Sequence, residues 1–212
     1  MKIELEQVSP KEIEKRSFEI IGEELGERIL DKTNEPIIKR VIHTTADFEY
    51  VDTLCFSKDA VNKAKESLKL GACIVTDTQM GRSGINKKML EKLGGEVFCF
   101  MSDTDVAEQA KVNHTTRATA SMDKAAGIPM PLIFAVGNAP TALIRLYELI
   151  REGKLKPELI IGVPVGFVNV VQAKELIMSL DVPYIVARGR KGGSNVAAAI
   201  CNALLYDMMK RD

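Results

Sequence analysis

Five short apolar segments recur along the chain, and each is separated from the next by a stretch with helical periodicity. Strands that alternate with helices in this way predict βαβ units and a parallel sheet. Right-handed crossovers then place helices on both faces of that sheet. We therefore expect a single doubly wound α/β domain with a mainly parallel five-stranded sheet. The predicted strands are ACIVT (72–76), EVFCFM (96–101), PLIFAV (131–136), ELIIGV (158–163) and YIVAR (184–188).

The first quarter of the chain has a different pattern, and we expect residues 1–57 to form a helical N-terminal extension before a βα-repeating core of residues 58–212. Apolar residues at helical spacing predict a first helix that runs to about Leu30. Pro36 opens a second helix, and His43 falls in its last turn. Residues 48–56 form a strand or an extended connection. Within the core, one long helix is expected from about residue 105 to 126.

Composition excludes several classes of protein. Lys and Arg total 29, as do Asp and Glu, so the basic excess typical of nucleic-acid binding is absent. No apolar run approaches the ~20 residues of a membrane span, and the charged N-terminus does not resemble a signal peptide. We expect a cytoplasmic protein without a membrane partner. Four scattered cysteines and two histidines give little support for a zinc site.

The segments that follow the predicted strands are rich in glycine and in basic residues. Ligands of open parallel sheets bind beyond the carboxyl ends of the strands, and glycine lets backbone N–H groups approach an anion there. One such loop is ordinarily a tight turn, but several with Arg or Lys favour a polyanionic ligand. The phosphate-binding patterns G-x-G-x-x-G and G-x-x-x-x-G-K-[ST] are absent, so carboxylates are as plausible as phosphates. The loops are TDTQMGRSGIN, MSDTD, GNAPTA, GVPVGFVN and ARGRKGGSN.

Two kinds of chemistry can be weighed from single residues. Asp77, Asp103 and Asp105 could bind magnesium at strand ends, but such residues more often cap helices, so we predict no metal site. His43 is a natural proton donor near neutral pH, and it could equally complement the dipole at the end of its helix. His114 is expected in the middle of a helix, in a structural role.

Six segments are spread over most of the chain: IKRVIHTTADFEY, TDTQMGRSGIN, TTRATASMD, GNAPTAL, GVPVGFVNVVQAKE and RGRKGGSNVAAAICNALL. In these segments the chain resembles the precorrin-8X methylmutase family, also called cobalt-precorrin-8 methylmutase. The resemblance implies a cofactor-independent isomerase of cobalamin biosynthesis that moves a methyl group from carbon 11 to carbon 12 of a corrin-type macrocycle. The product would be hydrogenobyrinate or cobyrinate, and cobalt would arrive only within the substrate. The family also implies a homodimer.

The resemblance also implies roles for individual residues. His43 matches the family's catalytic histidine, a general acid. Ser17 and Arg40 match substrate-contacting positions, and Arg117 is similar to an arginine beside the ring system. Loop position adds further candidates for binding a polycarboxylate corrinoid: Thr45, Arg82, Ser83, Asn138, Arg190, Lys191 and Ser194. The apolar ring would lie beside residues such as Met80, Pro164 and Phe167.

A different class of function remains open at this point. A non-catalytic carrier of an anionic tetrapyrrole or nucleotide would keep the basic glycine-rich loops but would not need His43. Three details are also open: whether the macrocycle carries cobalt, what holds the His43 tautomer, and whether Thr44 and Thr45 orient the imidazole or end the helix.

Overall fold

The segments predicted as strands lie side by side in the computed structural model, which describes residues 6–209. They form one sheet of six strands in the order β1-β6-β5-β4-β2-β3. Neighbouring strands are parallel, except that β1 pairs antiparallel with β6 at one edge. The predicted doubly wound α/β fold is confirmed, with one strand more than predicted. The strands are β1 (Leu54–Phe56), β2 (Cys73–Thr76), β3 (Val97–Phe98), β4 (Leu132–Val136), β5 (Leu159–Gly162) and β6 (Tyr184–Ala187).

The central strands are buried on both faces, which explains why they are continuous apolar runs rather than alternating patterns. Successive side chains point to opposite faces of the sheet. Ile74 and Ile133 belong to the core on one face, and Val75 and Phe134 belong to the core on the other. The sheet therefore separates two apolar layers.

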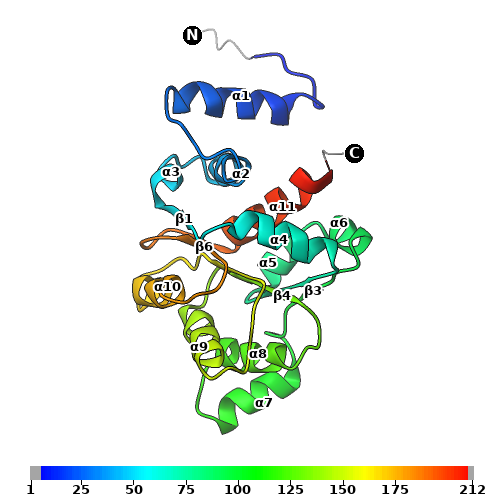
Figure 1. The fold of residues 1–212 in the computed structure, drawn as a ribbon, viewed down its shortest axis with the longest axis vertical. Helices are drawn as coiled ribbons and strands as arrows, with labels where there is room; N and C mark the ends of the chain where they lie inside the picture. The colour runs from blue at the N-terminus through cyan, green and yellow to red at the C-terminus, as the bar shows by residue number, and fades with distance from the viewer. Residues whose placement is uncertain (1–5, 210–212) are drawn as a thin grey trace, which may run out of the picture.

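Helices cover both faces of the sheet (Figure 1). One face carries α4 (Ala60–Lys69), α5 (Gln79–Gly84), α6 (Lys87–Lys92) and α11 (Ser194–Met209). The other face carries α8 (Arg117–Ala126), α9 (Pro140–Arg151) and α10 (Val170–Met178), with α7 (Thr104–Val112) packed outside α8. None of the helices within residues 6–209 combines the length and the apolar character needed to cross a membrane.

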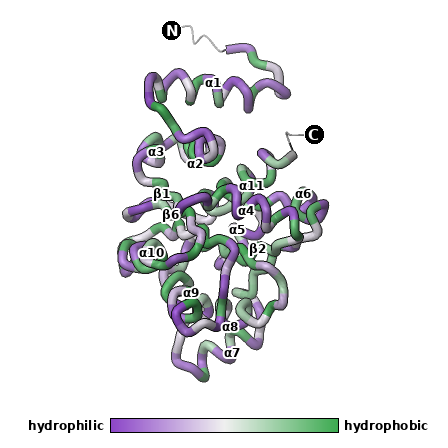
Figure 2. Tube along the Cα trace, in the orientation of Figure 1, coloured by the Kyte–Doolittle hydropathy of each residue, from purple (hydrophilic) through white to green (hydrophobic). Residues whose placement is uncertain are grey.

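The N-terminal helices form an additional layer on the α11 side (Figure 1). Here α2 (Glu35–Thr45) packs on α11, α1 (Ile13–Leu25) packs on α2, and α3 (Tyr50–Thr53) leads into β1. The contact face of α2 is apolar, because Ile37, Ile38, Val41 and Ile42 are all buried. Hydrophilic residues predominate along α1, the outermost helix of this layer (Figure 2). The extension is thus anchored through α2 to a helix of the core.

The strand order has a switch point between β2 and β4. From β2 the chain moves outward to β3 and then returns to β4 on the opposite side of β2. At such a switch point the loops at the carboxyl ends of the two strands diverge, and ligands of open α/β sheets bind there. The loops of the predicted site therefore lie along this carboxyl edge of the sheet.

The first helix is shorter than predicted. It ends at Leu25, because Gly26 takes a positive φ of 58° that interrupts the helix. Ile29, which the periodicity placed on the buried face of that helix, is 98% exposed. The apolar period continued past the residue that ends the helix, so the prediction to Leu30 was wrong.

Three other predicted segments differ in detail. The helix expected over residues 105–126 is two helices, α7 and α8, separated by a turn in which His114 has a φ of 50°. His114 is therefore not in the middle of a helix. The segment after β2, expected to be a loop, contains α5, and residues 48–56 contain the short helix α3 as well as strand β1. The N-terminal extension consequently contributes the antiparallel edge strand.

Candidate active site

His43 lies in the last turn of α2 with its side chain exposed. Phe18 of α1 stacks on the imidazole, with 5.3 Å between ring centroids and 23° between ring planes. Within residues 6–209 the imidazole nitrogens have no hydrogen-bond partner. The imidazole is thus oriented by ring stacking, and its nitrogens face solvent or a bound ligand.

The two threonines after His43 bond to their own helix. The Thr44 hydroxyl donates to the carbonyl of Arg40 at 2.9 Å, and the Thr45 hydroxyl donates to the carbonyl of Val41 at 2.8 Å. The Thr45 oxygen also accepts from the N–H of Asp47 at 3.3 Å. These bonds complete the last turn of α2, so neither threonine orients the imidazole.

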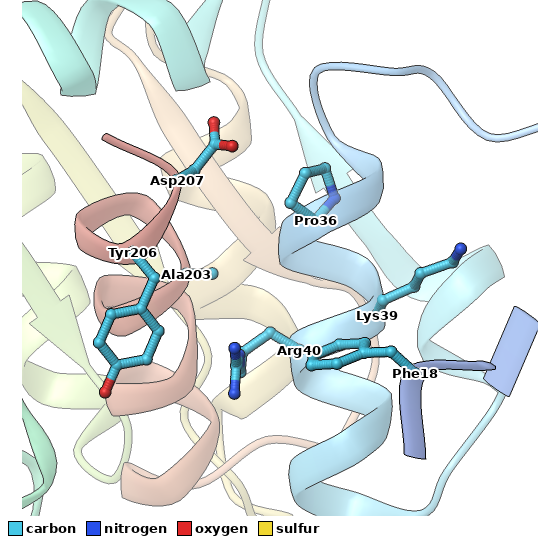
Figure 3. Close-up of a pocket in the computed structure, with 7 residues that line it drawn as sticks. All are labelled: Phe18, Pro36, Lys39, Arg40, Ala203, Tyr206 and Asp207. Atoms are coloured by element: carbon cyan, nitrogen blue, oxygen red, sulfur yellow. The ribbon is translucent and has the colours of Figure 1, made fainter. Parts of the chain in front are cut away.

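Arg40, one turn before His43, is enclosed by aromatic rings. Its guanidinium carbon lies 4.8 Å from the ring centroid of Phe18 and 5.1 Å from that of Tyr206 on α11, between the two rings (Figure 3). It also forms an ion pair with Glu14 of α1. Such cation–π contacts fix the plane of the guanidinium. Arg40 is therefore pre-oriented, and a substrate carboxylate would have to replace Glu14.

Two open cavities adjoin this cluster and share Phe18, Arg40 and Tyr206. The first, of about 230 Å³, lies between α1, α2 and α11 (Figure 3). The second, of about 430 Å³, is bounded by α1 and adds Lys11, Glu14 and Lys15. Ser17 lies beside Phe18, but its hydroxyl donates to the carbonyl of Ile13 at 2.8 Å. Of the two predicted contact residues, Arg40 lines both cavities, whereas the hydroxyl of Ser17 is bonded within α1.

At the switch point, Asp77 fixes the loop that follows β4. Its buried carboxylate accepts hydrogen bonds from the N–H groups of Gly137, Asn138 and Ala139 at 2.8, 2.8 and 2.6 Å. Burial raises the pKa of this carboxyl, whereas the three N–H groups act in the opposite direction. The carboxylate of Asp77 is occupied by these three backbone hydrogen bonds, which makes Asp77 unsuited to bind magnesium.

The other two aspartates that were considered for magnesium are also engaged. Lys124 donates to Asp103 and to Asp105, each at 2.7 Å. Among the described residues, no group of three His, Cys, Asp or Glu side chains is arranged to hold a metal ion.

A second contact at the switch point joins the start of α11 to the loop after β2. The hydroxyls of Thr78 and Ser194 are 2.7 Å apart. Gly137 lies against the same residue, and a Cβ there would come within 2.6 Å of the Ser194 Cα, so only glycine fits. Ser194 therefore ties two loops together at the switch point, while the neighbouring Asn138 remains exposed.

The loops after β5 and β6 are bonded into one unit. The N–H of Gly193 donates to the carbonyl of Val163 at 2.8 Å, and the N–H of Gly166 donates to the carbonyl of Arg190 at 3.1 Å. The Arg190 guanidinium carbon lies 5.4 Å from the ring centroid of Phe167, which is 81% exposed. An exposed aromatic ring and an arginine thus stand together on this edge.

Lys191 connects that unit to the segment after His43. Its ammonium donates to Asp47 at 2.6 Å and forms an ion pair with Glu49. The hydrogen bond with Asp47 is the main cause of a raised pKa of Lys191, and the same bond lowers the pKa of Asp47. This clamp brings the C-terminal end of α2, and with it His43, to the carboxyl edge of the sheet.

Comparison with known proteins identifies the family. A model of precorrin-8X methylmutase matches residues 12–207. The cobalt-precorrin-8 methylmutase of Priestia megaterium is 48% identical, over 93% of this chain and 88% of that protein. That of Leptospira interrogans is 43% identical, over 95% of each chain. This chain belongs to the precorrin-8X methylmutase family.

A solved structure agrees. The precorrin-8X methylmutase from Thermus thermophilus superposes with a TM-score of 0.86 at 38% identity, covering 94% of this chain and 98% of that one. The family predicted by resemblance is therefore confirmed. The protein is a methylmutase, an isomerase of cobalamin biosynthesis that transfers a methyl group within one molecule.

Three more of the predicted residues lie on α5 and α8. Arg117 begins α8, and the hydroxyl of its neighbour Thr116 lies 3.0 Å from that of Thr141, next to the loop after β4. Arg82 and Ser83 are exposed on α5, where Arg82 donates to the carbonyl of Val97 at 3.2 Å. Their roles in binding stay predictions.

Two of the apolar residues expected beside the ring are exposed, and one is not. Met80 and Phe167 are 70% and 81% exposed. Pro164 is buried in this structure. Sequence reasoning missed Phe18 and Tyr206, the two rings that enclose Arg40. An aromatic residue on each helix that flanks the histidine helix was the only signal, and such residues are common in helical cores.

Proposed function

We propose that this methylmutase moves a methyl group from carbon 11 to carbon 12 of cobalt-precorrin-8 to give cobyrinate, with His43 as the general acid. The observation that carries the proposal is the exposed imidazole stacked on Phe18 at 5.3 Å, clamped through Lys191 and Asp47 to the basic edge of the sheet. The cobalt form is chosen because the two relatives at 48% and 43% identity are named for it.

The chemistry needs one proton and no redox partner. Protonation of the conjugated macrocycle by the imidazolium withdraws electron density from the carbon that carries the methyl group. The bond from carbon 11 to the methyl group then breaks as the bond to carbon 12 forms, with the same electron pair. The macrocycle releases the proton afterwards, so substrate and product are isomers. Cobalt takes part only as a component of the substrate.

Binding is assigned to the basic residues of the edge. The guanidinium carbons of Arg40 and Arg190 lie over aromatic rings, 4.8 and 5.4 Å from the ring centroids of Phe18 and Phe167, and a guanidinium suits bidentate contact with carboxylates. Arg82, Arg117, Asn138 and the apolar Phe167 extend the same surface. The homodimer and the cytoplasmic location stay predictions.

Replacing His43 with alanine tests the proposal. Turnover of cobalt-precorrin-8, followed by the change in its absorption spectrum, should fall about 10²- to 10⁴-fold, the usual contribution of a general acid. Affinity for the macrocycle, measured by spectroscopic titration, should change little. His114→Ala is the matched control, since the other histidine is exposed in the turn between α7 and α8.

Two results would contradict the proposal. Unchanged turnover in His43→Ala would contradict the role of His43 as the general acid. Binding of the macrocycle without turnover by the unaltered protein would favour a carrier function. A higher kcat/KM with the metal-free macrocycle than with the cobalt form would overturn the choice of substrate.

A further inference from the structure

Lys174 of α10 is a buried cation that the proposed chemistry does not use. Its side chain is fully inaccessible, and Lys174 and Asp77 are the charged residues that are buried in the described chain. Its ammonium donates to the carbonyl oxygens of Gly189 and Lys191 at 2.8 and 2.9 Å. Both carbonyls belong to the loop between β6 and α11, which Lys174 thus contacts from inside the protein.

Burying the ammonium of Lys174 costs free energy compared with an apolar side chain at the same position. Within residues 6–209 no carboxylate pairs with Lys174, and burial lowers its pKa to about 8. Removing an ammonium from water is costly unless its hydrogen bonds replace the lost hydration. A methionine of similar length would pack the same stem at no such cost. What the ammonium adds at this position is therefore its two hydrogen bonds to the carbonyls of the loop.

The residue between those two carbonyls is Arg190. Its guanidinium stacks on Phe167, and its carbonyl accepts from Gly166. On the same loop, Gly192 approaches the carbonyl of Val163 so closely that a Cβ would lie 2.0 Å from the oxygen. Glycine makes the backbone of this loop flexible before folding, so its shape depends on the bonds that hold it.

We infer that Lys174 is a positioning residue, whose ammonium fixes the loop of residues 188–193 so that Arg190 meets the carboxylates of the substrate. This inference rests on the proposed function for the identity of that substrate. Lys174 does not touch the substrate, because α10 and the loop enclose it. Its loss should weaken binding and leave the methyl shift of bound substrate intact.

The kinetic test uses Lys174→Met, which keeps the stem and removes the ammonium. With cobalt-precorrin-8 as substrate, KM should rise roughly ten-fold while kcat stays within about two-fold of the unaltered enzyme, as expected for lost binding contacts. The matched control is Ile177→Ala. Ile177 is equally buried one turn along α10, within the apolar core on the α9 side of the sheet, so its loss should lower stability without raising KM.

A second measurement needs no substrate. Hydrogen exchange of the backbone amides of residues 188–193 should be about ten-fold faster in Lys174→Met than in the unaltered protein, and not in Ile177→Ala. In Lys174→Ala, added n-propylamine should restore KM and slow the exchange, whereas n-propanol should not. This rescue requires the ammonium, and packing alone would not produce it.

The outcomes separate the inference from the proposed function. If the unaltered protein fails to convert the macrocycle, the proposed function falls, and the exchange data still decide whether Lys174 holds the loop. If the unaltered protein is active and Lys174→Met shows normal KM and normal exchange, the inference is overturned. A fall in kcat at unchanged KM would also overturn it.

Discussion

Arg40 is held by three partners before any substrate arrives: the rings of Phe18 and Tyr206 and the carboxylate of Glu14. These contacts differ in how readily they can be exchanged. Glu14 is 58% exposed, and ion pairs with an exposed partner contribute only about 0–1 kcal/mol. The rings, by contrast, set the plane of the guanidinium. A substrate carboxylate can therefore replace Glu14 without reorienting Arg40.

At this residue scale, we expect Arg40→Ala to raise the Kd for the macrocycle about ten-fold at low salt, because a bidentate charged contact is lost. The loss should shrink as ionic strength rises, since salt screens the contact in the unaltered enzyme. Glu14→Gln should lower the Kd by less than about three-fold, because it removes only a weak ion pair that competes with the substrate for Arg40. Titration at two salt concentrations measures both effects. A salt-independent loss in Arg40→Ala would show that Arg40 is structural.

At the scale of elements, the predictions that succeeded rest on local signals. The five buried strands were visible because continuous apolar runs of this length suit a sheet that is covered on both faces. The second helix was predicted to open at Pro36 with His43 in its last turn, and α2 spans Glu35–Thr45. The break between α7 and α8 was not visible, because His114 adopts a left-handed conformation without a glycine or proline to signal it. The three-residue strand β1 was too short to distinguish from a connection.

The site could be predicted only in part, for a physical reason. Residue type and position singled out His43 and the strand-end loops as candidates, and the family resemblance gave His43 its expected role. The enclosure of Arg40 depends on α1, α2 and α11 packing together, and no local pattern specifies that contact. The same holds for Lys191, whose partners Asp47 and Glu49 are more than 140 residues away in sequence. Lys191 was predicted as a substrate ligand, but its ammonium is engaged in this clamp.

The clamp between these elements can be tested by a double-mutant cycle. If Lys191 acts by joining the end of α2 to the loop after β6, then Lys191→Met and Asp47→Asn should each lower kcat/KM, and the double variant should lose little more than either one. The expected coupling is about 1 kcal/mol, with Lys191→Arg as the variant that keeps the pair. Additive losses, measured as kcat/KM for the four proteins, would instead indicate that Lys191 binds the substrate directly.

At the scale of the whole molecule, the buried ammonium of Lys174 should make global stability depend on pH. Burial lowers its pKa from 10.5 to about 8 in the folded protein. Between these values the unfolded chain binds the proton more often than the folded one, so the free energy of unfolding rises with pH. The rise is at most on the order of 3 kcal/mol, because the two carbonyls favour the charged form and oppose the shift.

Urea unfolding of the unaltered protein and of Lys174→Met, at intervals from pH 7 to 10, measures this dependence. The stability of the unaltered protein relative to the variant should increase above pH 8, while other titrating groups cancel in the difference. The neutral amine retains two N–H groups for its two carbonyls, so the loop should stay formed. A difference that is constant with pH would show that Lys174 titrates as an ordinary lysine.

The packing of α2 on α11 also has a consequence for how the protein is made. The apolar face of α2, with Ile37, Ile38, Val41 and Ile42, is covered by the last of the described helices, about 150 residues later in the sequence. During synthesis this face stays exposed until α11 has left the ribosome, and such early apolar surfaces are natural clients of chaperones. Closing so long a loop is also slow. His43 is therefore translated about 150 residues before the helix that covers its own helix.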